Sequence, residues 1–269
     1  MNPLDWDLGN VPPGIAWGGV DEAGRGAWAG PVVAACAVID PGAARKWGHV
    51  LREARDSKRL SPERREVMAL ELKSALAGWA VAEADNLTVD RENVLEATLS
   101  TMRDAIRGVP TAPRILFVDG DRAPKSGLLE RLVVDGDDLS CAVACASILA
   151  KTHRDALMRE YDAIYPAYGF AHHKGYGTAE HRAALDRLGA SPVHRISYSP
   201  VESRLHPDPA VREDLRGRLE EARSVTELQA WVETRLRPNY GRLKRIWIET
   251  LRRRYGDLLA QLAVREEGR

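Results

Sequence analysis

Cysteine is scarce in this chain of 269 residues, which contains only Cys36, Cys141 and Cys145. An odd number of cysteines in apolar surroundings argues against a disulfide framework, and the absence of a CxxC pair or adjacent histidines argues against a zinc site. We therefore expect three buried free thiols. Their use as small apolar residues is typical of a protein from a reducing compartment, and we expect a cytoplasmic location.

Long apolar runs and an excess of charge are missing as well. No stretch approaches the roughly 18 consecutive apolar residues of a membrane-spanning helix. Residues 1–20 carry Asp5 and Asp7 and lack the basic and apolar regions of a signal peptide, so we expect no membrane association. The 39 Lys and Arg residues balance 39 Asp and Glu residues, so only a local cluster could indicate a polyanionic partner.

Apolar residues are plentiful, at 44% of the chain, and this is enough for a sizeable core. Segments with strand-like and helix-like patterns alternate, which predicts an α/β fold with helices packed on a sheet. The first half of the helix expected from residue 140 is apolar almost all round, which predicts that it packs inside the domain. We expect strands at residues 17–21, 31–39, 79–84, 115–118 and 132–134, and helices at 61–76, 89–107 and 140–161.

The pattern changes after about residue 200, and we expect a first domain over residues 1–204 and a helical, locally basic extension over 205–269. A proline-rich stretch at 206–209 resembles a linker, and Pro238 is expected to break the helices that follow. Residues 235–255 contain eight Lys or Arg residues and one acid, with aromatic residues interleaved. This basic segment either extends a nucleic-acid contact or belongs to a packed helix whose arginines are solvated.

Four acidic residues occur at the ends of expected strands or beside glycine turns, where open α/β sheets collect their functional groups. They are Asp21, Glu22, Asp119 and Asp137. Carboxylates without histidine or cysteine partners suit Mg²⁺ or Mn²⁺, and two such ions can hydrolyse a phosphodiester. The alternative is that these acids are ordinary turn residues, with Asp137 capping the helix that follows it.

Five blocks resemble the bacterial ribonuclease HII family, and they occur in the same order over residues 15–201. Departures from the family pattern are few: Ala27, Trp28, Cys145 and Gly177, none of which is an inferred metal ligand. The blocks are GGVDEAGRGAWAGPVVAACAVI (18–39), DSKRLS (56–61), FVDG (117–120), GDDLSCAVACASILAKTHRD (136–155), and YPAYGFAHHKGYGTAEH (165–181) with PVHRISY (192–198).

The resemblance implies a ribonuclease H-like fold, with a central mixed sheet flanked by helices and a helical C-terminal extension outside the resemblance. It implies an endonuclease that cleaves the RNA strand of RNA–DNA hybrids and cuts 5′ of ribonucleotides embedded in duplex DNA. Hydrolysis with two divalent ions, Mg²⁺ or Mn²⁺, would leave 3′-hydroxyl and 5′-phosphate ends. These nucleic acids are the expected partners, and the expected oligomeric state is a monomer.

Site residues follow from the same blocks. The resemblance makes Asp21, Glu22, Asp119 and Asp137 the catalytic metal ligands, Gly24, Arg25 and Gly26 the ribose-sensing turn, and Tyr176 a residue that stacks beside the DNA. Glycines allow the backbone to approach a sugar closely, and a 2′-hydroxyl offers both a donor and an acceptor. Lys58 and Ser140 are expected to contact phosphate, although a solvated lysine and a helix cap are the alternatives. The histidines at 172, 173, 181 and 194 lack ligand spacing and are expected to pack in loops.

Three other functions stay open at this point. The sister family ribonuclease HIII normally carries an N-terminal substrate-binding domain, for which the twenty residues before Asp21 leave little room. A noncatalytic nucleic-acid-binding module would need no set of four acids. A metal-independent hydrolase that uses a carboxylate pair would be insensitive to chelation.

Overall fold

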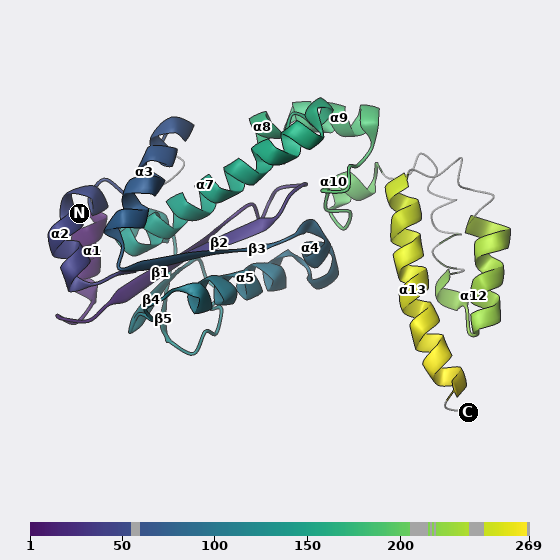
Figure 1. Cartoon of the computed structure of the whole chain (residues 1–269), viewed down its shortest axis with the longest axis horizontal. Coiled ribbons are helices and arrows are strands. Elements are labelled where there is room, and N and C mark those ends of the chain that lie inside the picture. Colours follow the sequence, from purple (N-terminus) through teal and green to yellow (C-terminus); the bar gives the residue numbers. More distant parts are fainter. Residues whose placement is uncertain (55–59, 205–214, 216, 218, 237–244, 268–269) are drawn as a thin grey trace. The chain divides into compact units, whose positions relative to one another are not determined.

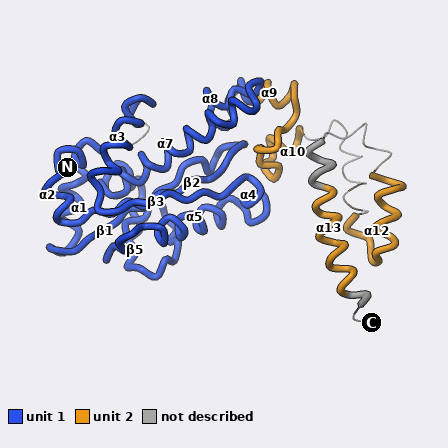
Figure 2. Tube along the Cα trace, viewed as in Figure 1, with its two compact units in different colours: residues 1–181 blue, residues 182–269 orange. Residues whose placement is uncertain are grey.

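The computed structural model describes residues 1–54, 60–204, 215, 217, 219–236 and 245–267. Contacts divide the chain into two compact units, residues 1–181 and 182–269 (Figure 2). This division falls inside one helix, α9 (Ala179–Leu188), and the domain boundary at residue 204 stays a prediction. The expected linker at 206–209 and the expected break at Pro238 lie outside the described residues.

A mixed five-stranded sheet forms the centre of the first unit (Figure 1). Its strand order is β3-β2-β1-β4-β5; β1 pairs antiparallel with β2 and parallel with β4. The expected mixed α/β sheet is therefore confirmed, with strand bounds that shift by up to three residues. The strands are β1 (Trp17–Ala23), β2 (Val32–Ile39), β3 (Gly78–Ala84), β4 (Ile115–Asp119) and β5 (Leu129–Val133).

Helices cover both faces of this sheet, and β2 shows why its sequence is apolar at every position. The odd-numbered residues 33–39 pack in the cluster that contains α7 (Cys141–Ile164), whereas the even-numbered residues 34–38 pack against α5 (Val94–Gly108). A strand that is buried on both faces reads as a continuous apolar run. Cys36, Cys141 and Cys145 lie in these two clusters as buried free thiols, as the sequence predicts.

The α7 helix packs on β1 at very short range. Residues 141–150 are all buried, which confirms the prediction of an internal helix. A Cβ atom at Gly19 would lie 2.1 Å from the carbonyl carbon of Ala142, so strand and helix meet backbone to backbone. Asp7 reinforces this contact because its Oδ2 accepts hydrogen bonds from Trp17 Nε1 and from the Ala142 amide, each at 2.9 Å. Burial raises the pKa of Asp7 to about 6.

The remaining helices of the first unit include several that the sequence analysis did not predict. A single helix was expected over residues 89–107, but α4 (Asn86–Glu92) and α5 are separate. Asn93 lies between them with φ +68° and caps α5 through hydrogen bonds from the Leu95 and Glu96 amides. The helix expected at 61–76 is α3 (Pro62–Ala75). The sequence analysis did not predict α1 (Pro3–Asn10), α2 (Pro41–Leu51), α6 (Gly136–Leu139), η2 (Pro166–Tyr168) or α8 (Phe170–His173).

The second unit is helical and has a core of its own. Its elements beyond α9 are α10 (Ser199–Glu202), α12 (Val225–Trp231), η3 (Val232–Leu236) and α13 (Arg245–Glu267). Leu228, Trp231, Leu251 and Leu262 belong to one buried cluster, so the apolar positions of α13 serve packing. Across the residues that the structure describes, no helix has the length and apolarity needed to cross a membrane.

The contact between Gly19 and α7 generates a stability prediction. We expect Gly19→Ala to lower the free energy of unfolding by roughly 3 kcal/mol, the upper end of the range for overpacked cores, because the neighbouring atoms are backbone. Gly9→Ala is the matched control, since a Cβ there meets nothing within 4 Å and should change stability by less than about 1 kcal/mol. Urea unfolding measures both; equal stability of the two variants would contradict the close contact.

Candidate active site

One pocket of about 480 Å³ brings together most of the residues that the sequence analysis singled out. Acidic side chains, the glycine turn and one tyrosine share its wall, although they come from distant parts of the chain. Its lining consists of Asp21, Glu22, Ala23, Gly24, Arg25, Gly26, Asp119, Asp137, Ser147, Lys151 and Tyr176. The fold therefore brings the four acids together in one pocket, as the sequence predicts.

Strand register explains why Asp21 and Asp119 meet. The parallel strands β1 and β4 pair Val20 with Val118, which sets the next residues, Asp21 and Asp119, side by side. Because Val20 and Val118 pack toward α5, the alternation of a strand directs the following side chains toward the α7 face. Asp21 lies within β1, which continues to Ala23, and not after the strand as the sequence suggested.

Asp137 reaches the same pocket through a short connection. The chain leaves β5, turns at Asp135 in the left-handed region, and enters α6, which carries Asp137 in a buried position. The Gly136 amide donates a hydrogen bond of 2.7 Å to Asp119 Oδ1. This bond ties the start of α6 to the end of β4, and so places the third and fourth acids together.

Mutual repulsion characterises the acids of this pocket. Burial, followed by the charges of Glu22 and Asp119, raises the pKa of Asp21 well above its usual range, although a hydrogen bond from Ser147 opposes the shift. Burial also raises the pKa of Glu22, against the effect of the Arg25 guanidinium 3.3 Å away. Clustered, partly desolvated carboxylates of this kind are most stable beside a positive charge.

The donor set fits divalent ions that prefer oxygen ligands. All four acids line one pocket, and no histidine or cysteine is found among the described residues that line it. Within the described ranges, no three carboxylate, histidine or cysteine side chains converge tightly enough to form a ready-made cage for one ion. The four carboxylates therefore line one pocket without converging on a single point.

The glycine turn, residues 24–26, follows β1 directly and packs against the buried side chain of Arg154. Gly24 has φ +95°, and a Cβ there would lie 2.1 Å from Arg154 Nε, so only glycine fits. Gly26 differs, because a Cβ at that position would meet nothing within 4 Å. Arg25 is exposed and reaches back to Glu22. Packing therefore requires glycine at position 24, whereas Gly26 leaves open space at the pocket.

Arg154 on α7 connects the turn to the segment that carries Tyr176. Its guanidinium donates hydrogen bonds to the backbone oxygens of Pro31, Ala29 and Lys174, at 3.0, 3.1 and 2.9 Å. The same guanidinium lies 5.3 Å from the centre of the Tyr176 ring, a cation–π distance. Arg154 thus contacts both the glycine turn and the segment that carries Tyr176.

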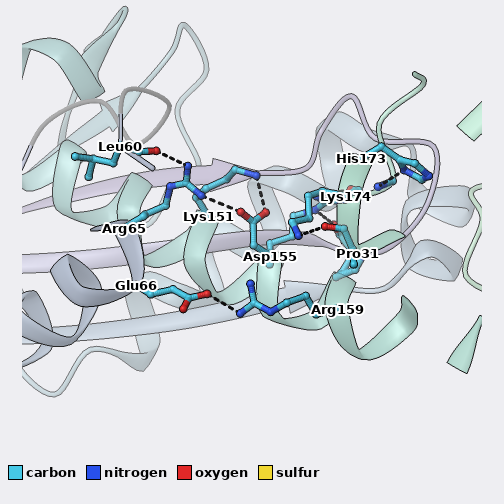
Figure 3. Close-up of polar contacts among 12 residues, drawn as sticks. Pro31, Leu60, Arg65, Glu66, Lys151, Asp155, Arg159, His173 and Lys174 are labelled. Atoms are coloured by element: carbon cyan, nitrogen blue, oxygen red, sulfur yellow. Dashed lines mark hydrogen bonds and ion pairs between the residues drawn. The ribbon is translucent and has the colours of Figure 1, made fainter. Parts of the chain in front are cut away.

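Ser147 and Lys151 line the pocket, and the sequence analysis did not single them out. Asp155 is buried between Lys151 Nζ at 2.5 Å and Arg65 Nη1 at 2.9 Å (Figure 3). Arg65 also donates to the Leu60 carbonyl oxygen at 3.0 Å. Residues 147, 151 and 155 recur every four positions along α7, starting within its apolar first half, and this polar stripe was the signal that would have found them.

Of two further expected substrate contacts, one does not reach the pocket and the other lies outside the described residues. Ser140 is fully buried at the start of α7, where its Oγ accepts a hydrogen bond of 3.3 Å from the Val143 amide. This is the capping role that the sequence also allowed, and Ser140 is not among the residues that line the pocket. Lys58 lies outside the described residues.

Solved structures with the same fold define the class of protein. Ribonuclease H2 from Pyrococcus horikoshii aligns with a TM-score of 0.62 at 24% identity, covering 71% of this chain and 97% of that one. A Bst ribonuclease HIII in complex with Mn²⁺ aligns with a TM-score of 0.58 at 18% identity, covering 71% and 70%. At these identities the likeness shows the fold alone: the first unit has a ribonuclease H-like fold.

The sequence comparisons identify the family. The profile of the family described as Ribonuclease HII matches residues 18–201. Ribonuclease HII of Thiobacillus denitrificans is 50% identical over 183 residues, which are 68% of this chain and 87% of that protein. The chain belongs to the ribonuclease HII family, and it is a ribonuclease H, an endonuclease of a family that depends on divalent metal ions. This membership decides against ribonuclease HIII and against a noncatalytic binding module.

The two glycines of the turn generate a paired prediction. We expect Gly24→Ala to destabilise the fold by roughly 1–3 kcal/mol, because alanine is strained at φ +95° and its Cβ would displace Arg154. We expect Gly26→Ala to leave stability unchanged within about 1 kcal/mol, yet to reduce cleavage of an RNA–DNA hybrid roughly tenfold to a hundredfold by filling space at the pocket. Urea unfolding and initial rates measure the two effects. Full activity of Gly26→Ala would show that no substrate group approaches this glycine.

Proposed function

We propose that this enzyme cleaves the RNA strand of RNA–DNA hybrids and the phosphodiester on the 5′ side of a ribonucleotide embedded in duplex DNA. In this reaction, water attacks the phosphorus atom and the bond to the 3′-oxygen breaks. The products carry a 3′-hydroxyl and a 5′-phosphate. The observation that carries the proposal is the single pocket in which four carboxylates lie beside a glycine turn and an exposed tyrosine.

The four acids Asp21, Glu22, Asp119 and Asp137 are the proposed ligands of two divalent ions, Mg²⁺ or Mn²⁺. Bound together, two such ions would supply an activated water and neutralise the charge on the departing 3′-oxygen. The raised pKa of Asp21 and of Glu22 supports this assignment, because burial, and after it repulsion by neighbouring acids, disfavours their charged forms, and a bound cation would favour them. The hydrogen bond from Ser147 partly opposes the raised pKa of Asp21.

The residues around the acids would recognise the nucleic acid. We propose that the backbone of Gly24 to Gly26 meets a ribose 2′-hydroxyl; the open space at Gly26 supports this role. Arg25 and Lys151 are the proposed phosphate contacts, and both lie at the pocket. Tyr176 offers a partly exposed ring on which a sugar or base can stack. We further propose a cytoplasmic monomer.

The test of substrate and metal uses a duplex DNA with one ribonucleotide. We expect Mg²⁺ or Mn²⁺ to support a single cut on the 5′ side of that nucleotide and EDTA to abolish it, because the acids would lose the ions they hold. An all-DNA duplex of the same sequence is the control and should remain intact. Mapping of the ends should find 3′-hydroxyl and 5′-phosphate. Cleavage that continues in EDTA would contradict the metal-dependent mechanism.

Asp21 tests the proposed ligand set. We expect Asp21→Asn to reduce turnover roughly 10²- to 10³-fold or more, because an amide cannot replace a central carboxylate ligand. Binding of the duplex, measured by fluorescence anisotropy, should persist because the substitution removes a negative charge. Asp138→Asn is the matched control: Asp138 is exposed, adjoins Asp137 and does not line the pocket. Wild-type turnover in Asp21→Asn would remove Asp21 from the ligand set.

A further inference from the structure

Three residues that the proposed reaction does not use hold the backbone of Gly175 and Tyr176 by hydrogen bonds. The Gly175 amide donates to His173 Nδ1 at 3.1 Å, and the Gly175 carbonyl oxygen accepts from the Trp28 amide at 2.8 Å. The Tyr176 carbonyl oxygen lies 3.0 Å from His181 Nδ1. These bonds fix the backbone immediately before and at the tyrosine that lines the pocket.

The hydrogen bonds determine the protonation of both histidines. His173 Nδ1 accepts from an amide, so its Nε2 carries the proton and donates to the Tyr168 carbonyl oxygen at 2.8 Å. His181 Nδ1 faces a carbonyl oxygen and therefore carries its proton. Burial lowers the pKa of His181 to about 4, so this ring is neutral near pH 7. Both rings are thus set to bind the backbone of one loop.

Ring contacts join these residues into one cluster. The His173 and His181 rings stack with centroids 4.3 Å apart and planes inclined by 11°. The Trp28 ring lies 5.4 Å from the His181 ring on the same cluster. A Cβ at Gly177 would lie 2.2 Å from the Trp28 ring, so the indole occupies the space beside the residue that follows Tyr176. Trp28 therefore contacts the loop through its backbone and its side chain.

We propose that Trp28, His173 and His181 are positioning residues that hold the backbone of Gly175 and Tyr176, and through it the Tyr176 ring, at the wall of the active-site pocket. The three residues together are the loop clasp. The clasp fixes the backbone, while Arg154 and Lys151, at 5.3 and 5.9 Å from the ring centre, flank the ring itself. The inference rests on the proposed role of Tyr176 as a nucleic-acid contact.

His181 variants separate the hydrogen bond from the packing. We expect His181→Leu, which removes the donor, to raise KM for the single-ribonucleotide duplex roughly three- to tenfold and to change kcat less. His181→Asn should keep KM close to the wild-type value, because its amide nitrogen can donate from nearly the position of Nδ1. Equal impairment of the two variants would overturn the role of this hydrogen bond.

A double-mutant cycle with Tyr176→Ala tests whether the clasp acts through the tyrosine. In the Tyr176→Ala background, His181→Leu should add less than about a twofold further loss in kcat/KM, because the ring it positions is gone. The same fold-loss in both backgrounds would indicate a general structural role and would overturn the proposal.

Amide hydrogen exchange supplies a readout that needs no substrate. The Gly175 and Thr178 amides should exchange faster in His181→Leu than in the wild type and His181→Asn; unchanged exchange would overturn the clasp. Failure of the proposed function is distinguishable, because the wild type would then leave the single-ribonucleotide duplex uncut while the exchange data still report on the clasp.

Trp28 and Gly177 provide a second, reciprocal test. We expect Gly177→Ala to lower kcat/KM roughly tenfold, since its Cβ would push the indole away from His181. The double variant Trp28→Leu with Gly177→Ala removes the clash and should recover activity relative to Gly177→Ala alone. Wild-type activity of Gly177→Ala would overturn the contribution of Trp28.

Discussion

The backbone contact between β1 and the start of α7 is the constraint on which the rest of this structure depends. Gly19 allows the strand to approach Ala142 more closely than any side chain would permit. Asp7, on α1, accepts hydrogen bonds from both elements, and its burial between them raises its pKa. With this distance set, Asp21 on the strand faces Ser147 on the helix, and Arg154, about two turns further along, contacts the glycine turn.

Electrostatics and packing oppose each other in the pocket. Carboxylates that repel one another would separate if their backbones were free to move, but each is attached to an element of the buried sheet or to α6. The hydrogen bond from Gly136 to Asp119 and the pairing of β1 with β4 hold the acids together despite the raised pKa of Asp21. Fold stability thereby maintains an arrangement suited to cations, which is a common relation between stability and function.

Trp28 and Gly177 illustrate how departures from a family pattern acquire meaning in three dimensions. The two positions are far apart in sequence, and each departure alone seemed unimportant. In the fold they are in contact, because the indole occupies the space that a larger residue at 177 would need. The bulk of the indole is matched by the missing side chain at Gly177, and the loop of Tyr176 keeps its hydrogen bonds.

The sequence by itself determined the α/β class, the buried helix expected from residue 140, and which four acids share the pocket. Apolar runs and ordered motifs are local properties of the chain, so they can be recognised in the sequence alone. The separation of α4 from α5 at Asn93, the roles of Ser147 and Lys151, and the capping by Ser140 were decided by tertiary structure. The physical reason is that strand register and helix packing select which side chains share a pocket, and both depend on contacts between residues distant in the chain.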